Sequence, residues 1–195
     1  MTRIFFTLLI AFIVLPSVAQ TSTGDDEPTP IRFDRNHSTL GFIVPIVKGL
    51  SKVTGKFTDF SVDLIWQADD LDASSVQVEI QVESIETGIE GRNKHLKSDD
   101  FFDVAVYPTI TFVSSKIRQN GEAYLVDGTL TMHGVVREVT LPLSTSTFTD
   151  ADHTWTAFRV SSILDRTEYG MTWKHSSADF FVGDEIEIDI VLLTR

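Results

Sequence analysis

Arg92 and His95 are the pair of side chains best placed to bind a polar group. They stand three residues apart in a charge-rich segment, residues 89–98, and they share a face if this segment is helical. A guanidinium and an imidazole on one face can hold a phosphate or a carbonyl oxygen through charge-assisted hydrogen bonds. The alternative is a structural role, in which Arg92 pairs with a nearby acid and His95 is a satisfied surface or packing residue.

The rest of the chain shows no sequence motif of a metal site or of a catalytic nucleophile. The sequence has no cysteine, and its five histidines form neither a His-x-His nor a His-x-x-x-His pair. It also lacks a Gly-x-Ser-x-Gly elbow and a glycine-rich phosphate loop. We therefore expect no catalytic residue, no metal and no cofactor, and we expect a protein that is not an enzyme.

Two further motifs are interpreted as structural. His133-Gly134 is predicted to form a turn, because glycine takes a positive φ readily and histidine tolerates unusual turn geometry. Asp165-Arg166, followed by the glycine at position 170, is predicted to form a corner made of an ion pair and a glycine bend. A ligand contact at His133 and a functional role for the corner are the alternatives.

Strands are the elements expected to position these residues. Apolar and polar side chains alternate with a period of two from Ile31 onward, most clearly in residues 76–83 and 185–192. Strands with one dry and one wet face indicate an antiparallel sheet. We expect a short helical segment near residues 89–98 and about eight long strands, at residues 39–46, 52–59, 60–67, 74–84, 109–118, 122–132, 137–148 and 154–164, with a closing strand at 184–193.

Long antiparallel strands with one apolar face can hide that face by closing into a barrel. A barrel of about eight strands is either just filled by side chains or able to hold one small ligand. If it is hollow, the expected wall residues are Phe42, Val78, Ile80, Val82, Ile110, Phe112, Leu141, Ile188 and Ile190. If it is solid, the same side chains fill the core of an exported barrel or sandwich module without a ligand.

The start of the chain has the pattern of a secretory signal at residues 1–19. A positive residue, Arg3, precedes an apolar run at residues 4–15, and Ser17-Val18-Ala19 supplies the small residues of a cleavage site after Ala19. A retained N-terminal anchor helix is the alternative. Residues 20–30 are predicted to be a disordered acidic linker, and residues 31–195 to form one domain.

The net charge of the chain limits the classes of partner that it can be expected to bind. Asp and Glu number 28 against 16 Lys and Arg, for a net charge of −12. This acidic balance argues against nucleic acid and against an anionic membrane surface, both of which attract basic patches. We expect no nucleic acid and no stable membrane anchor.

Several strings occur in a characteristic order: Val53-Thr54-Gly55-Lys56-Phe57, Arg92-Asn93-Lys94-His95-Leu96, Tyr107-Pro108-Thr109-Ile110-Thr111-Phe112, Leu130-Thr131-Met132-His133-Gly134-Val135 and Asp165-Arg166-Thr167-Glu168-Tyr169-Gly170-Met171. Together they resemble the YceI-like, polyisoprenoid-binding family over about residues 31–194. The resemblance implies a lipocalin-like barrel whose apolar tunnel holds a polyisoprenoid or other long-chain lipid, for transport or storage in the periplasm. A homodimer and a lipid-modifying enzyme are left open.

Two positions depart from that family's pattern. The family often has a histidine shortly after Phe42-Ile43-Val44, where this chain has Pro45-Ile46, and Asn93 replaces an aspartate. Both departures concern residues near a ligand's polar head, so the identity of the head group is open.

Overall fold

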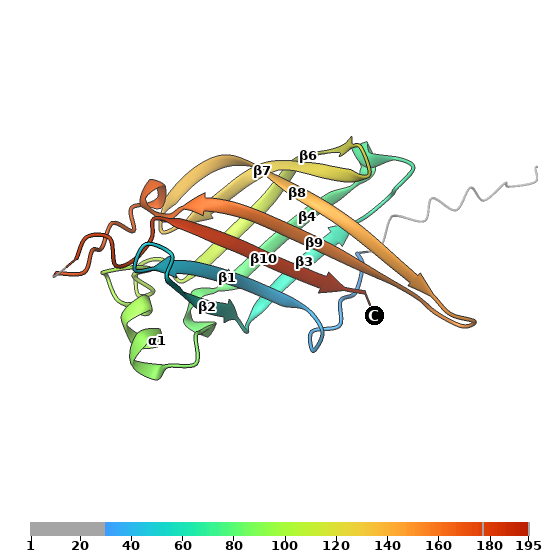
Figure 1. Cartoon of the computed structure of the whole chain (residues 1–195). Helices are drawn as coiled ribbons and strands as arrows, with labels where there is room; N and C mark the ends of the chain where they lie inside the picture. The colour runs from blue at the N-terminus through green and yellow to red at the C-terminus, as the bar shows by residue number, and fades with distance from the viewer. Residues whose placement is uncertain (1–29, 177, 195) are drawn as a thin grey trace, which may run out of the picture.

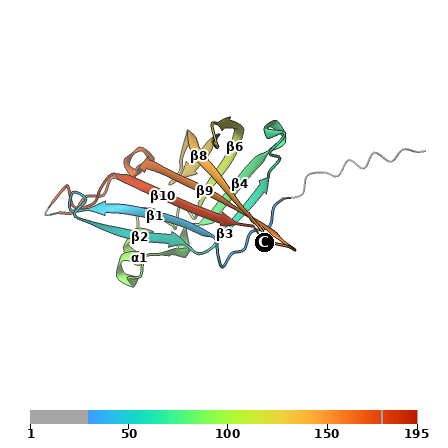
Figure 2. The ribbon, with the colours of Figure 1, turned by 45° about the vertical axis from the view of Figure 1, so that its right-hand side comes forward.

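The alternating segments form one antiparallel sheet of ten strands that curls around an apolar interior (Figures 1 and 2). The computed structural model describes residues 30–176 and 178–194, so the predicted signal and most of the linker lie outside it. The strands are β1 (Thr39–Ile46), β2 (Ser51–Phe57), β3 (Phe60–Ile65), β4 (Ser75–Gln81), β5 (Ile85–Glu86), β6 (Thr109–Asn120), β7 (Ala123–Met132), β8 (Val135–Thr149), β9 (Thr154–Asp165) and β10 (Glu185–Leu193).

The helical elements are short. The α-helix α1 (Glu90–Lys97) lies at one end of the sheet, and there are three 3-10 turns, η1 (Leu71–Ala73), η2 (Val82–Ser84) and η3 (Arg166–Tyr169). The prediction of an all-β, lipocalin-like fold with a helical segment near residues 89–98 is thus confirmed, with ten strands where about eight were expected.

Most strands pair with their neighbours in the chain, in the order β3-β4-β6-β7-β8-β9-β10-β1-β2-β5. The end strands, β3 and β5, are not paired in this order, so the curl is closed by other means. The two-residue strand β5 adds to the end of β2, and the corner between β2 and β3 is tied to η2 because Thr58 N donates to Ser84 O over 3.2 Å. Beside this corner, Leu96 of α1 and Phe102 pack against the buried core.

The predicted strand at residues 74–84 ends early. β4 stops at Gln81 and the chain turns through η2, although the alternation of the sequence continues to Glu83. The Ser84 hydroxyl donates to Gln81 O over 2.7 Å and accepts from Thr58 N over 3.1 Å. A serine side chain that bonds local backbone groups competes with the sheet ladder, which explains the change.

The predicted turn at His133-Gly134 is confirmed. Both residues are left-handed, with φ of 51° and 74°, and they link β7 to β8 directly. Two consecutive left-handed residues match the twist of a tight hairpin. His133 Nδ1 lies 2.8 Å from Tyr169 O, and since a carbonyl can only accept, Nδ1 donates this bond.

For the corner at residues 165–170, the predicted glycine bend is confirmed, and the predicted Asp165–Arg166 ion pair is wrong. Gly170 has a φ of 82° and closes η3. Asp165, however, caps η3 by accepting from Thr167 N over 2.8 Å, while Arg166 pairs with Asp184 over 2.7 Å. Adjacent side chains here leave the backbone in different directions, so neighbours in sequence do not meet.

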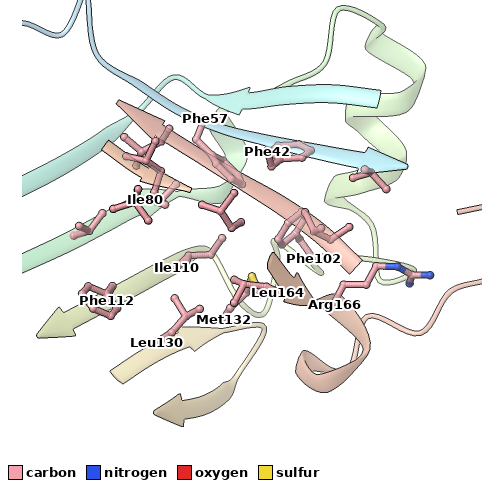
Figure 3. A pocket seen from close by; sticks show the side chains of 18 of the residues that line it. Phe42, Phe57, Ile80, Phe102, Ile110, Phe112, Leu130, Met132, Leu164 and Arg166 are labelled. Atoms are coloured by element: carbon pink, nitrogen blue, oxygen red, sulfur yellow. The ribbon is translucent and has the colours of Figure 1, made fainter. Parts of the chain in front are cut away.

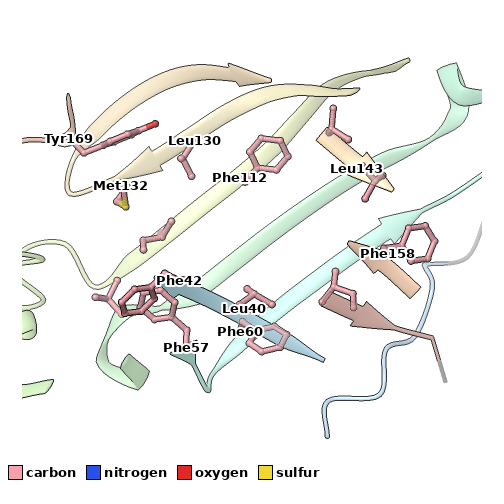
Figure 4. Packing of buried hydrophobic residues seen from close by; sticks show 14 of the residues in the cluster. Leu40, Phe42, Phe57, Phe60, Phe112, Leu130, Met132, Leu143, Phe158 and Tyr169 are labelled. Atoms are coloured by element: carbon pink, nitrogen blue, oxygen red, sulfur yellow. The ribbon is translucent and has the colours of Figure 1, made fainter. Parts of the chain in front are cut away.

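The core occupies the two ends and the walls of the curled sheet. Figure 4 shows buried side chains reaching inward from strands on both sides, among them Phe42, Phe112, Leu130 and Phe158. Inward-facing residues of β4 and β10, such as Val78 and Ile188, remain only half-buried. They line a void rather than meeting opposite side chains, which is the feature that defines the candidate site.

Candidate functional site

An apolar cavity of about 530 Å³ lies inside the curled sheet (Figure 3). Its wall draws on β1 to β4, α1 and β6 to β10, together with residues 101–102 and the segment before β10. This volume falls within the range of pockets that hold small ligands. A module without a ligand would have an interior packed with side chains at normal density, whereas this interior is hollow.

The sequence-predicted wall residues largely come together. Eight of them line the cavity: Phe42, Val78, Ile80, Ile110, Phe112, Leu141, Ile188 and Ile190. Val82 does not, because the chain leaves the sheet at η2 and its side chain is 1 % exposed within solid core. Whether the eight contact a ligand stays a prediction.

Other wall residues were missed by reasoning from sequence. Leu130 and Met132 alternate with threonines on β7, so the same period-two signal could have found them. Phe102, Trp173 and Phe181 come from irregular segments that carry no periodic signal.

One end of the cavity is closed by aromatic rings. Phe158 forms part of the wall, and behind it the ring of Trp66 stands at 77° with centroids 5.4 Å apart. Tyr124 packs edge-on against Trp66 at 4.7 Å, and Phe33 packs edge-on against Phe158 at 6.1 Å. Edge-to-face pairs of this kind are favourable, so this end is a rigid apolar floor.

The other end carries the ionisable side chains of the wall. These are Arg92, His95 and Arg166, and the wall of the described chain includes no Asp or Glu. Two carboxylates stand just behind this wall, because Asp100 contacts His95 over 2.8 Å and Asp184 contacts Arg166 over 2.7 Å. The basic donors of the wall suit a ligand head group that accepts hydrogen bonds or carries negative charge.

Arg92 and His95 share the face of α1 that lines the cavity, as their spacing predicted. Arg92 Nε donates to Thr87 Oγ1 over 2.8 Å and Nη2 donates to Thr87 O over 2.6 Å. The expected alternative, an ion pair with an acid, is therefore wrong for Arg92. Because threonine supplies neutral acceptors only, the guanidinium charge is left uncompensated by these bonds and can act on a ligand.

His95 is held by a carboxylate and by aromatic rings. Its Nε2 lies 2.8 Å from Asp100 Oδ2, and its ring packs edge-on against Phe101 and Trp173, with centroids 5.0 and 4.9 Å apart. These contacts agree with the structural alternative for His95. They also position the ring at the end of the cavity that carries the ionisable side chains, because Phe101 and Trp173 line the wall as well.

Arg166 was interpreted as structural, and the structure places it on the cavity wall (Figure 3). Its side chain is 5 % exposed and donates to Gly183 O, Met171 O and the Asp184 carboxylate. Burial lowers the pKa of the guanidinium, and the charge of Asp184 opposes this shift. The bonds tie the segment that precedes β10 to the end of β9.

Among the residues that the structure describes, no group of three or more His, Asp or Glu side chains could hold a metal ion. In the same part of the chain, no helix has the length and apolarity that crossing a membrane requires.

Comparison with known proteins gives the family. A model of the YceI-like domain matches residues 32–193. The chain belongs to the YceI-like family. UPF0312 proteins of Vibrio vulnificus and Pseudomonas aeruginosa are 35 % and 32 % identical to it, over 54 % and 63 % of this chain. The matched segments cover 56 % and 65 % of those relatives, less than two thirds of their length.

Solved structures share the fold of this YceI-like chain. BcnA of Burkholderia cenocepacia superposes with a TM-score of 0.75 and 26 % identity, covering 84 % of this chain and 99 % of BcnA. The YceI protein of Campylobacter jejuni gives 0.66 and 25 %, covering 75 % and 86 %. A polyisoprenoid binding domain from Saccharophagus degradans, implicated in plant cell wall breakdown, gives 0.62 and 21 %, covering 86 % and 98 %.

Proposed function

We propose that this YceI-like protein binds a polyisoprenoid or similar long-chain lipid in its cavity, as an exported, periplasmic carrier or store. The observation that carries the proposal is the cavity itself, which is apolar along its walls, closed by aromatic rings at one end and basic at the other. The name of the Saccharophagus degradans domain supports the polyisoprenoid class, and the signal pattern at residues 1–19 supports export.

The arrangement suits a lipid that enters tail first. Each buried CH2 group contributes about 0.8 kcal/mol, so a five-carbon isoprene unit contributes up to about 4 kcal/mol before the costs of binding. A few units therefore suffice for tight retention, and the apolar wall selects hydrophobicity rather than a defined tail length. The head group would stand beside Arg92 and His95.

The direct test is to identify what the protein carries. We expect a prenyl lipid, detected by mass spectrometry after purified protein is denatured and extracted with organic solvent. A delipidated sample should take up an added prenyl phosphate. The proposal fails if no lipid co-purifies and none of the prenyl lipids offered is bound.

The head-group position can be tested separately with Arg92→Met. This variant should weaken binding of a prenyl phosphate by about tenfold, the effect of one charge-assisted hydrogen bond, and leave the prenol with the same tail unchanged. Lys94→Met is the matched control, since Lys94 lies on α1 but does not line the cavity. Equal effects of the two substitutions would refute the proposed orientation.

A further inference from the structure

Two loops form a lip at the basic end of the cavity. We define the lip as the β1–β2 turn, residues 47–50, and the segment at residues 178–183 that precedes β10. Figures 1 and 2 show both loops projecting from the same end of the sheet, opposite the tip of the β8–β9 hairpin.

The lip behaves as one unit because its loops are bonded to each other. Val47 N donates to Phe181 O over 2.9 Å, and the Lys48 ammonium lies 4.8 Å from the centre of the Phe180 ring. Val47 and Lys48 are both left-handed, with φ of 50° and 55°. This conformation is strained for a β-branched residue and persists only where the surroundings hold it.

The strained turn exposes apolar side chains. Leu50 is 86 % exposed, Phe180 is 52 % exposed and Phe181 is 36 % exposed. Phe181 also lines the cavity, as do Ile46 at the end of β1 and Val182 beside it. Phe181 thus belongs both to the cavity wall and to the exposed apolar surface of the lip.

The hairpin that carries this turn is basic, although the chain as a whole is acidic. Residues 35–58 include four basic residues and no Asp or Glu, in a chain of net charge −12. Lys48 and Lys52 lie at the lip, while Arg35 and Lys56 lie toward the other end of β1 and β2. Lys52 and Lys56 are exposed on β2 and alternate with inward-facing residues. The net charge of the whole chain argued against an anionic membrane, but the hairpin at the lip places Lys48 and Lys52 within two residues of Leu50.

The other loop of the lip adds little charge of either sign. Asp179 is exposed within residues 178–183, and Asp184 just beyond them is paired with Arg166. Lys48 and Lys52 are therefore the hairpin charges nearest to Leu50, and Glu185 lies at the start of the neighbouring strand β10.

From these observations we propose that the lip binds to a phospholipid bilayer containing anionic lipid. Exposed leucine and phenylalanine enter the interfacial layer, while the lysine ammonium groups meet lipid phosphates. The cavity mouth then faces the apolar layer, and a lipid tail passes between membrane and protein without crossing water. The inference rests on the proposed function, because docking at this mouth serves a lipid carrier.

The test is vesicle flotation with the mature chain and the variant Leu50→Ser/Phe180→Ser. Wild-type protein should float with phosphatidylcholine vesicles that contain phosphatidylglycerol. The double variant should bind at least about tenfold more weakly, the order of affinity that one buried apolar side chain supplies. Phe148→Ser is the matched control, because Phe148 is 67 % exposed, pairs with Trp155 near the tip of the β8–β9 hairpin, and should leave binding unchanged when replaced.

The charge component has its own measurement. Lys48→Glu/Lys52→Glu should weaken binding to vesicles with phosphatidylglycerol, and added salt should do the same because it screens exposed charges. Vesicles of phosphatidylcholine alone should bind less protein than vesicles with phosphatidylglycerol. Equal binding to both compositions would overturn the assigned anionic preference.

Three outcomes would overturn the docking inference: no flotation of the wild type, undiminished flotation of the double variant, or a homodimer in sedimentation velocity that the double variant abolishes while vesicles are not bound. Uptake of a prenyl phosphate, measured without vesicles, separates this inference from the proposed function. Uptake without flotation removes the lip alone, and flotation without uptake removes the carrier function alone.

Discussion

Val78 and Val82 allow the cavity to be tested by one chemical change at two sites. Val78 on β4 faces the void, whereas Val82 in η2 is enclosed in solid core and 1 % exposed. Replacing either valine by phenylalanine adds the same ring. At Val82 the ring must displace packed atoms, which costs about 1–3 kcal/mol of the free energy of unfolding. At Val78 it fills empty apolar space, which adds about 0.5–2 kcal/mol.

The free energies of unfolding of the two variants should therefore differ by about 1.5–5 kcal/mol, measured by urea unfolding of delipidated protein. Delipidation is needed because a bound lipid would stabilise the wild type by mass action. Val78→Phe should also exclude up to one isoprene unit, weakening prenyl lipid binding by as much as about 4 kcal/mol, or roughly a thousandfold. If Val78→Phe destabilises the protein as much as Val82→Phe, the walls already meet in solution and the reasoning is refuted.

Three further predictions concern the scaffold. Arg166→Met should lower the free energy of unfolding by about 2–4 kcal/mol, because three acceptors lose their donor; a loss below about 1 kcal/mol in urea unfolding would contradict it. Gly128→Ala should lower the free energy of unfolding by about 1–3 kcal/mol, because the added Cβ would stand 2.5 Å from Val113 O. Gly91→Ala in α1 should raise it slightly, because no atom lies within 4 Å of the added Cβ and alanine favours a helix. Equal thermal midpoints of the two variants would contradict this prediction. The hydrogen bond from Arg118 lowers the pKa of Asp127 from 3.8 to about 2, so the ionised carboxylate stabilises the fold above about pH 4, and this stabilisation is lost as the pH falls toward 2. Asp127→Asn should therefore flatten the dependence of the urea midpoint on pH between about 4 and 2. An unchanged slope would count against this prediction.

Local patterns in the sequence were enough for much of the architecture. The alternation at Val76 to Ile80 and at Ile186 to Ile190 assigned each side chain to its face, because the period of a strand is two whatever the surroundings. The turn at His133-Gly134 and the helix containing Arg92 and His95 followed from residues adjacent in the chain. Eight of nine proposed wall residues reached the cavity for this reason.

Tertiary contacts decided the rest. Val82 does not line the cavity because the Ser84 hydroxyl bonds the backbone of Gln81 and of Thr58. Thr58 lies far from residues 74–84 in the chain, so the alternation of that segment could not predict this contact. Arg166 turned to Asp184 rather than Asp165 because side-chain direction depends on how β9 meets the segment before β10.

The amino-acid pattern was sufficient for the antiparallel sheet, for the inward and outward faces of its strands and for the resemblance to the YceI-like family. Three features required the folded chain: the void between inward side chains, the aromatic rings distant in sequence that close one end, and the apolar lip at the other end. The period of two along a strand specifies only to which face of the sheet each side chain points. Whether opposing side chains meet depends on the curvature of the sheet, which arises from contacts between residues far apart in the chain.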